Sequence, residues 1–275
     1  MIIEEPIPGV LVFKNALDTE SFDFLNFNRY VDSWKPWLPY GQMSKIDIKK
    51  IKESNFETSF WNAISFYKNK YNLSNVFEKQ IPGLDLLHYK KTLNEDIYLG
   101  AEKLSMRYHV DNAPWLQDTA GYKNTLTLTF YLNDEYTGGD IYFVDLSSAD
   151  NGSYEDLDGN SHECIFIDKP KKYSLSKGDI TVFPSSAPYY HAVSPIESGD
   201  RYLFRSFAVE YSPGSKEWNG RVKEIGLNNV LIEDQIKAQN GFDNRDHLIE
   251  IFSRPEDIDV NNKSINYIIK KEESL

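Results

Sequence analysis

The sequence predicts a chain of the α+β class that is mainly β, with a jelly-roll core (a double-stranded β-helix) buttressed by N-terminal helices. Two observations lead to this prediction. Apolar residues at helical spacing occur mainly in the first 75 residues, whereas strand-like alternation dominates residues 84–211. Aromatic content is 14%, with 18 Tyr and 16 Phe, which is typical of strands. Because no parallel crossover pattern separates the strands, we expect an antiparallel double-sheet architecture.

The N-terminal elements begin with a short apolar run at residues 10–13, which predicts a first strand. Asp18 is a suitable N-cap for a helix over residues 21–30. The next twenty residues are rich in Trp and Pro and predict an irregular connection. Residues 55–70 carry aromatic and apolar side chains close to helical spacing, so a second, amphipathic helix is expected there.

The core elements begin near residue 84, where the apolar period changes from about 3.6 to 2. Residues 125–132 form the clearest strand, with four apolar residues on one face and three threonines and Tyr131 on the other. The paired glycines in residues 133–139 predict a turn, and residues 141–144 are expected to return as the hairpin partner. Three later strands are predicted at residues 165–167, 180–183 and 201–211.

Polar stretches set the expected domain organisation. Residues 147–163 have almost no apolar content and predict a mobile surface insertion. The extension after residue 212 is polar, and we expect it to be partly helical and to end in disorder. Its two weak helical patterns lie around residues 230–238 and 247–252. The predicted organisation is therefore one domain at 1–212 (buttress 1–75, core 76–212) followed by an extension at 213–275.

Charge and composition exclude several classes of function. The 275 residues include 30 basic and 42 acidic side chains, a formal charge of −12 that should repel nucleic-acid backbones and anionic membranes. Cys164 is the one cysteine, so no intrachain disulfide forms. No basic segment followed by a long apolar run begins the sequence, and no stretch reaches membrane-spanning length. We expect a protein of the cytoplasm with no nucleic-acid or membrane partner.

A His-x-Asp pair provides the first indication of chemistry. His109 and Asp111 are two residues apart and would share one face of an extended strand. His191, far downstream, could complete a set of two histidines and one carboxylate, which are the usual protein ligands of a non-haem Fe(II) oxygenase. The pair alone is weak, because ordinary polar strand residues would give the same pattern.

Two arginines on one strand indicate an anion site. Arg201 and Arg205 are four residues apart and therefore share a strand face. An arginine suits a carboxylate held by two parallel hydrogen bonds. The Tyr131 hydroxyl, on the threonine face of its strand, could donate to the same anion. The alternative is that one or both arginines pair with Asp or Glu at the surface.

With these pieces in order, the region from residue 84 to residue 211 resembles the 2-oxoglutarate/Fe(II)-dependent dioxygenases of the prolyl 4-hydroxylase type. The similarity rests on five segments and on the ten-residue step from His191 to Arg201. These segments are His-Val-Asp-Asn at 109–112, Thr-Leu-Thr-Phe-Tyr-Leu-Asn at 127–133, Gly-Gly-Asp-Ile at 138–141, Lys-Gly-Asp-Ile-Thr-Val-Phe-Pro at 177–184, and His-Ala-Val-Ser-Pro-Ile-Glu-Ser-Gly-Asp-Arg-Tyr at 191–202.

The resemblance implies that His109, Asp111 and His191 bind Fe(II) and are the catalytic residues. It further implies that Arg201 and Tyr131 bind the distal carboxylate of 2-oxoglutarate and that Tyr89 lies near this co-substrate. Arg205 has no fixed role in the family and is assigned to the co-substrate site only by its strand face. O2 would be the oxidant, with ascorbate as a candidate reductant, and succinate and CO2 the by-products.

The predicted substrate is a prolyl residue in a peptide or protein, since residues 147–163 and 115–123 lie where similar proteins place lids over a peptide. Another protein side chain or a free amino acid is the alternative. A non-catalytic jelly-roll protein that binds a small ligand is the rival from another class. Nucleic-acid demethylation, performed by relatives with the same ligand set, is disfavoured by the negative charge.

Overall fold

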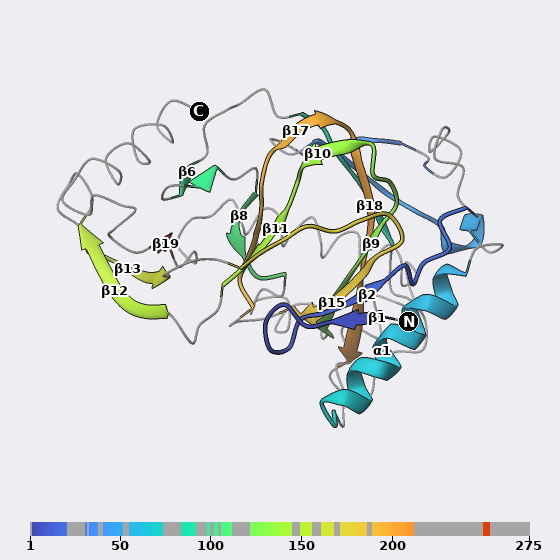
Figure 1. The fold of residues 1–275 in the computed structure, drawn as a ribbon, viewed down its shortest axis with the longest axis horizontal. Coiled ribbons are helices and arrows are strands. Elements are labelled where there is room, and N and C mark those ends of the chain that lie inside the picture. The colour runs from blue at the N-terminus through green and yellow to red at the C-terminus, as the bar shows by residue number, and fades with distance from the viewer. Residues whose placement is uncertain are drawn as a thin grey trace.

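The computed structural model describes most of the predicted core and several flanking segments (Figure 1). The described residues are 2–20, 31, 33–37, 41–51, 55–73, 84–91, 98–99, 102–103, 106–111, 122–144, 149–155, 161–167, 171–185, 189–211 and 250–253. The predicted helices at 21–30 and around 230–238 lie outside these residues, as does the end of the extension. No helix among the described residues is long and apolar enough to span a bilayer.

Two antiparallel sheets form the core, as predicted. The larger has the order β1-β2-β15-β9-β18-β5-β4-β3 and the smaller the order β14-β11-β16-β8. The strands of the larger sheet are β1 (Ile2–Glu4), β2 (Leu11–Lys14), β3 (Lys35–Trp37), β4 (Gly41–Lys45), β5 (Asp85–Tyr89), β9 (Tyr122–Tyr131), β15 (Ile180–Pro184) and β18 (Arg201–Tyr211). Those of the smaller are β8 (Met106–His109), β11 (Ile141–Phe143), β14 (Lys171–Tyr173) and β16 (His191–Val193).

Several short elements flank these sheets. They are the pair β10 (Tyr136–Gly138) and β17 (Ile196–Gly199), the pair β6 (Tyr98–Leu99) and β7 (Glu102–Lys103), and a 3-10 helix, η2 (Ile48–Ile51). A third sheet combines β12 (Ala149–Glu155), β13 (Ser161–Ile167) and β19 (Glu250–Ser253). Figure 1 shows this third sheet at the opposite end of the molecule from the helix α1 (Phe56–Lys70).

Alternation along the central strands separates a helix-facing side of the larger sheet from an inner side. Leu126, Leu128 and Phe130 of β9 pack with Phe204 of β18 and with the apolar stripe of α1 in the main core. Phe56 of α1 lies against the ring of Phe130 with their centroids 4.5 Å apart. This cluster buries the helix, as its amphipathic pattern predicts. The intervening residues face the smaller sheet and line the site described below.

Four predictions about individual segments were wrong. Residues 141–144 do contain a strand, but β11 pairs with β14 and β16 in the smaller sheet, not with β9. β9 pairs instead with β15 and β18. The connection that follows residue 30 contains β3, β4 and η2, and β4 extends the larger sheet beside β5.

The other two corrections concern polar segments. In the stretch predicted as a mobile insertion, the described residues belong to two strands, β12 and β13, which pair antiparallel. Where the predicted helix at 247–252 overlaps the described residues, the chain instead forms β19, which runs parallel to β13. Backbone pairing stabilises these strands without the apolar alternation that marks a half-buried strand in sequence.

Candidate metal centre

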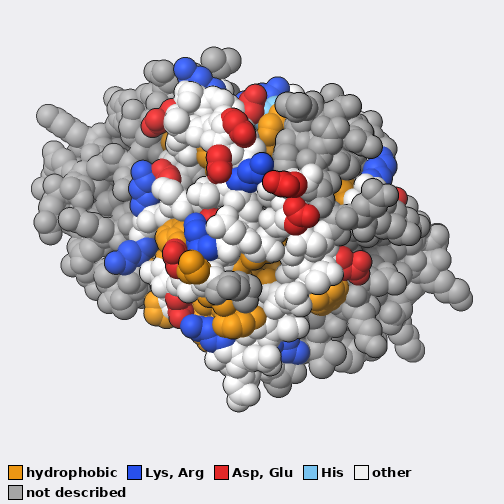
Figure 2. Space-filling model, turned by 45° about the vertical axis from the view of Figure 1, so that its right-hand side comes forward, with side chains coloured by type: hydrophobic (Ala, Val, Ile, Leu, Met, Phe, Trp, Pro, Cys, Tyr) orange, Lys and Arg blue, Asp and Glu red, His pale blue; other side chains and the backbone are white. Residues whose placement is uncertain are grey.

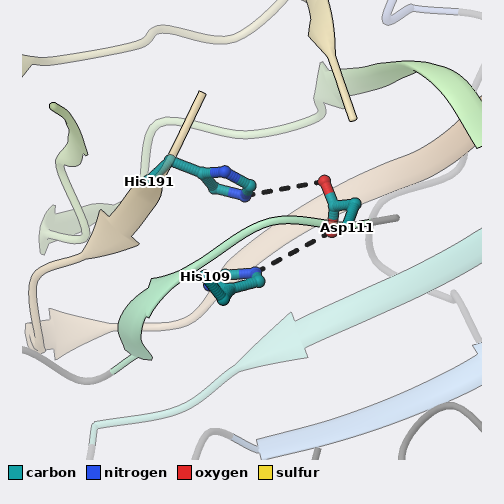
Figure 3. A group of neighbouring side chains, drawn as sticks. All are labelled: His109, Asp111 and His191. Carbon is teal, nitrogen blue, oxygen red and sulfur yellow. Dashed lines mark ion pairs between the residues drawn. The ribbon is translucent and has the colours of Figure 1, made fainter. Parts of the chain in front are cut away.

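The smaller sheet brings the three predicted ligands together (Figure 3). β8 and β16 are antiparallel neighbours in which His109 lies opposite His191. Asp111 lies two residues beyond the end of β8, so its position depends on a bend and not on the strand continuing. One ligand atom from each residue can be chosen so that all lie within 4.8 Å of one another. The Nε2 atoms of His109 and His191 lie 3.8 and 3.6 Å from Oδ1 and Oδ2 of Asp111, respectively.

Burial and charge make this cluster suited to a divalent cation. The Asp111 side chain is 5% exposed. Its burial acts to raise the pKa of the carboxyl, but His191, His109, Arg205 and a hydrogen bond from Thr127 outweigh burial and lower this pKa. Burial and the neighbouring His109 lower the pKa of His191 to about 4, although Asp111 opposes this shift. A neutral imidazole beside an ionised carboxylate is the state that binds a metal.

Groups behind the ligands orient them. The Thr127 hydroxyl donates a hydrogen bond to Oδ2 of Asp111 at 2.6 Å and lies 2.8 Å from the Ser185 hydroxyl. Nδ1 of His191 lies 3.3 Å from the carbonyl oxygen of Tyr189, which directs Nε2 towards Asp111. Sequence reasoning missed these groups as ligand supports. Only Thr127 had a signal, since alternation put it on the same face as Tyr131.

Arg201 lies on the same inner side of the larger sheet and is 1% exposed. Its Nη1 donates to the Gly139 carbonyl oxygen. Its guanidinium carbon lies 4.0 Å from the centroid of the Tyr89 ring and 5.9 Å from that of Tyr131. Nε has no hydrogen-bond partner, and no carboxylate of the described residues forms an ion pair with Arg201. A buried cation among aromatic rings, without a carboxylate partner, is suited to an anionic ligand.

Tyr131 and Tyr89, the two predicted co-substrate tyrosines, therefore flank Arg201 from the strands on either side of β18. Both side chains are almost fully buried. Burial raises the pKa of each hydroxyl, although Arg201 acts in the opposite direction. Each tyrosine therefore stays protonated and keeps its hydrogen-bond donor at neutral pH.

Arg205 lies in a different environment from Arg201. Its Nη2 donates to Oδ2 of Asp85 at 3.0 Å, and its Nη1 lies 3.8 Å from Oδ1 of Asp111. The Arg205 side chain is 14% exposed and that of Asp85 is 2% exposed. The arginine is thus paired with a carboxylate, as the alternative interpretation expected, but in the interior beside the predicted metal ligands and not at the surface.

Comparison with known proteins places these residues in a family context. Residues 97–208 match the family model of the 2OG-Fe(II) oxygenase superfamily, and this range includes the three predicted metal ligands and Arg201. Among solved structures, a prolyl-4-hydroxylase from Pseudomonas putida is similar at 17% identity and a TM-score of 0.44, over 73% of this chain and 92% of that one. A collagen prolyl hydroxylase from Paramecium bursaria Chlorella virus-1 is similar at 13% identity and a TM-score of 0.42, over 73% and 94%. No curated protein matches the chain.

Proposed function

We propose that the chain is an Fe(II)- and 2-oxoglutarate-dependent dioxygenase that hydroxylates a prolyl residue in a peptide or protein, because residues 97–208 match the family model of the 2OG-Fe(II) oxygenase superfamily. The observation that carries this proposal is the presence, between the two sheets, of a two-histidine, one-carboxylate cluster and a buried arginine without a carboxylate partner. The first suits Fe(II), and the second suits the distal carboxylate of 2-oxoglutarate.

The iron would be held by Nε2 of His109, Nε2 of His191 and one carboxylate oxygen of Asp111. These donors fit the group, because two nitrogens and one oxygen lie within 4.8 Å of one another, and two histidines with one carboxylate are the usual protein ligands of non-haem Fe(II) oxygenases. When bound with 2-oxoglutarate and O2, the iron supplies the oxidising power that hydroxylates an unactivated C–H bond, with release of succinate and CO2. Ascorbate would serve as the external reductant.

The chain's own residues would prepare this chemistry by orientation and exclusion of water. Thr127 fixes one oxygen of Asp111, and the Tyr189 carbonyl fixes the ring of His191. Arg201, between the rings of Tyr89 and Tyr131, would hold the co-substrate at its distal end, where burial strengthens the interaction of opposite charges. The carboxylate of Asp111 favours hydroxylation, because halogenating relatives carry a small residue there.

A peptidyl proline is the proposed substrate because the order of motifs resembles the prolyl 4-hydroxylase type. The alternative substrate is another protein side chain or a free amino acid, which the same iron and co-substrate sites could also hydroxylate. The charge of −12 disfavours a nucleic acid. Among the described residues on the face drawn in Figure 2, basic side chains are interspersed with acidic ones and do not form a continuous basic stripe.

The test is a screen of proline-containing peptides with Fe(II), 2-oxoglutarate and ascorbate, read by succinate release and by a mass increase of about 16 Da, one oxygen atom. We expect oxidation at proline in the native protein and none with Asp111→Ala. Oxidation at another residue would support the assignment as a dioxygenase but contradict the proposal of a prolyl substrate. Without succinate or oxidised product for any substrate, a non-catalytic jelly-roll protein that binds a small ligand becomes the better account.

A further inference from the structure

Charged side chains of the larger sheet form a row that ends at the metal ligands. The register places Lys45 of β4 opposite Asp85 of β5, and Asp85 opposite Arg205 of β18. Lys45 forms an ion pair with Oδ1 of Asp85, and Arg205 donates to Oδ2 of the same carboxylate. The row therefore runs from Lys45 through Asp85 and Arg205, on three strands of the larger sheet, to Asp111. Its first three members have no part in holding the iron or 2-oxoglutarate in the proposed function.

The guanidinium of Arg205 lies between two buried carboxylates. Nη2 is 3.0 Å from Asp85 and within hydrogen-bond distance, whereas Nη1 is 3.8 Å from Oδ1 of Asp111 and beyond it. The effect of Arg205 on Asp111 is therefore that of a nearby charge and not of a directed bond. The directed bond to Asp111 comes from Thr127, on the other oxygen.

The charge of Arg205 acts strongly on its neighbours because these side chains are buried. The side chains of Arg205, Asp85 and Asp111 are 14%, 2% and 5% exposed, so water screens their interactions weakly. The guanidinium group of an arginine stays protonated at every pH at which the protein is folded. The arginine is thus a permanent cation beside the carboxylate that would bind iron.

We propose that Arg205 is a positioning residue that sets the charge balance of the metal centre, making the apoprotein bind a divalent cation less tightly and the metal-loaded protein bind dianionic 2-oxoglutarate more tightly. This inference rests on the proposed function. A cation held at Asp111 lies within a few ångströms of the guanidinium and is repelled by it, whereas a dianion at the same metal is attracted. One residue thus shifts the two affinities in opposite directions.

Arginine suits this place better than lysine because its planar fork offers separate nitrogens to the two carboxylates. A lysine would keep the charge but reach only one of them. The charge, and not the fork, determines the two affinities, so Arg205→Lys should retain both within about threefold of the native values.

The experiment measures two dissociation constants in each variant, with Co(II) as the metal probe in the absence of iron. Co(II) binding to the apoprotein is followed by its visible absorption, and 2-oxoglutarate binding to the Co(II)-loaded protein by calorimetry. For Arg205→Gln we expect the Co(II) dissociation constant to fall about tenfold and the 2-oxoglutarate constant to rise about tenfold. Asp85→Asn, which removes a negative charge from the same row, should shift both constants in the reverse directions by about threefold.

Lys14→Gln is the matched control. Lys14 also forms an ion pair with a buried carboxylate, Asp179, but on β2 and without contact to a metal ligand. This variant should change neither the Co(II) nor the 2-oxoglutarate dissociation constant. It should be less stable than the native protein, because the buried carboxylate loses its partner. Circular dichroism checks that each variant is folded, and Asp85→Asn keeps the test decisive if Arg205→Gln does not fold.

The results separate this inference from the proposed function. If Arg205→Gln weakens both ligands, or changes neither, Arg205 does not act through charge and the inference is wrong. If the native protein binds neither Co(II) nor 2-oxoglutarate, the proposed function itself fails, and the inference with it. The inference is supported if the Co(II) and 2-oxoglutarate dissociation constants shift in opposite directions in Arg205→Gln, and if each shifts the other way in Asp85→Asn.

Discussion

Thr127 on β9 and Asp111 beyond β8 are joined by a 2.6 Å hydrogen bond across the two sheets of the core. The ionised carboxylate can only accept, so the threonine hydroxyl donates its proton to Oδ2. Ser185, 2.8 Å from the same hydroxyl, must then donate to Thr127. The larger sheet thus fixes the direction of a carboxylate that follows a strand of the smaller sheet.

Thr127→Val should weaken metal binding with little effect on the fold. Valine keeps the shape of threonine but leaves Oδ2 of Asp111 without its donor, and loss of such a support typically lowers metal affinity about 10–100-fold. Metal titration of the apoprotein measures the change. Thr181→Val is the control, because Thr181 is a buried threonine that bonds Thr129 and not a ligand. Equal losses in the two variants would contradict the role given to Thr127.

Arg201→Met should separate co-substrate binding from stability. Removing a buried cation that has no carboxylate partner should leave the thermal stability of the apoprotein unchanged or raised. Loss of the charge-assisted pair, worth roughly 2–5 kcal/mol, should raise the 2-oxoglutarate dissociation constant at least about thirtyfold. Calorimetric titration of the metal-loaded protein measures this constant. An unchanged value would move the co-substrate role to another residue.

Gly139→Ala should displace the Arg201 side chain, whereas the same substitution at another turn glycine, Gly178, should not. Gly139 has φ +71°, and an added Cβ would lie 2.6 Å from Cδ1 of Ile196 and 3.1 Å from Nη1 of Arg201. Gly178→Ala imposes similar backbone strain at φ +85°, but its nearest contact would be 3.3 Å from the Leu17 carbonyl oxygen. Both variants should lose about 1–3 kcal/mol of stability. Only Gly139→Ala should also raise the 2-oxoglutarate dissociation constant. Equal dissociation constants in the two variants would contradict the claim that Gly139 positions Arg201.

Glu5 should contribute to stability only above mildly acidic pH. Hydrogen bonds from Lys70 and Tyr71, with smaller contributions from Gly9, lower its pKa from 4.5 to about 2. Since the unfolded chain binds the proton more readily, this contribution is complete above pH 4.5 and is lost as the pH falls towards 2. The side chain is 31% exposed, so we expect about 1 kcal/mol or less.

Denaturant unfolding of the native protein and Glu5→Gln would check this. The native protein should be the more stable at pH 6, and the difference should vanish towards pH 2. A difference that persists at low pH would contradict the electrostatic origin.

The sequence predicted the inner side of the larger sheet well, because strict alternation puts Arg201, Arg205 and Tyr131 on one side. It failed where pairing is decided in three dimensions. In a jelly roll, consecutive strands alternate between sheets, so β11 follows β9 in the chain but pairs with β14 and β16. A turn signal alone cannot distinguish this arrangement from a hairpin.

The third sheet was missed for a different reason. β12 and β13 are joined by their backbones and β13 is extended by β19, about eighty residues downstream. The β12 segment, Ala-Asp-Asn-Gly-Ser-Tyr-Glu, has no apolar alternation to reveal it. Ser185 and the Tyr189 carbonyl were likewise invisible, since their role depends only on which ligand they contact after folding.

The most direct test of the central claim is an anaerobic absorption titration of the Fe(II)-loaded protein with 2-oxoglutarate. If His109, Asp111 and His191 hold the iron and 2-oxoglutarate binds to it, a weak visible metal-to-ligand band should grow to saturation in the native protein and be absent in Asp111→Ala. A native protein that develops no band and forms no succinate when O2 is admitted would contradict the account.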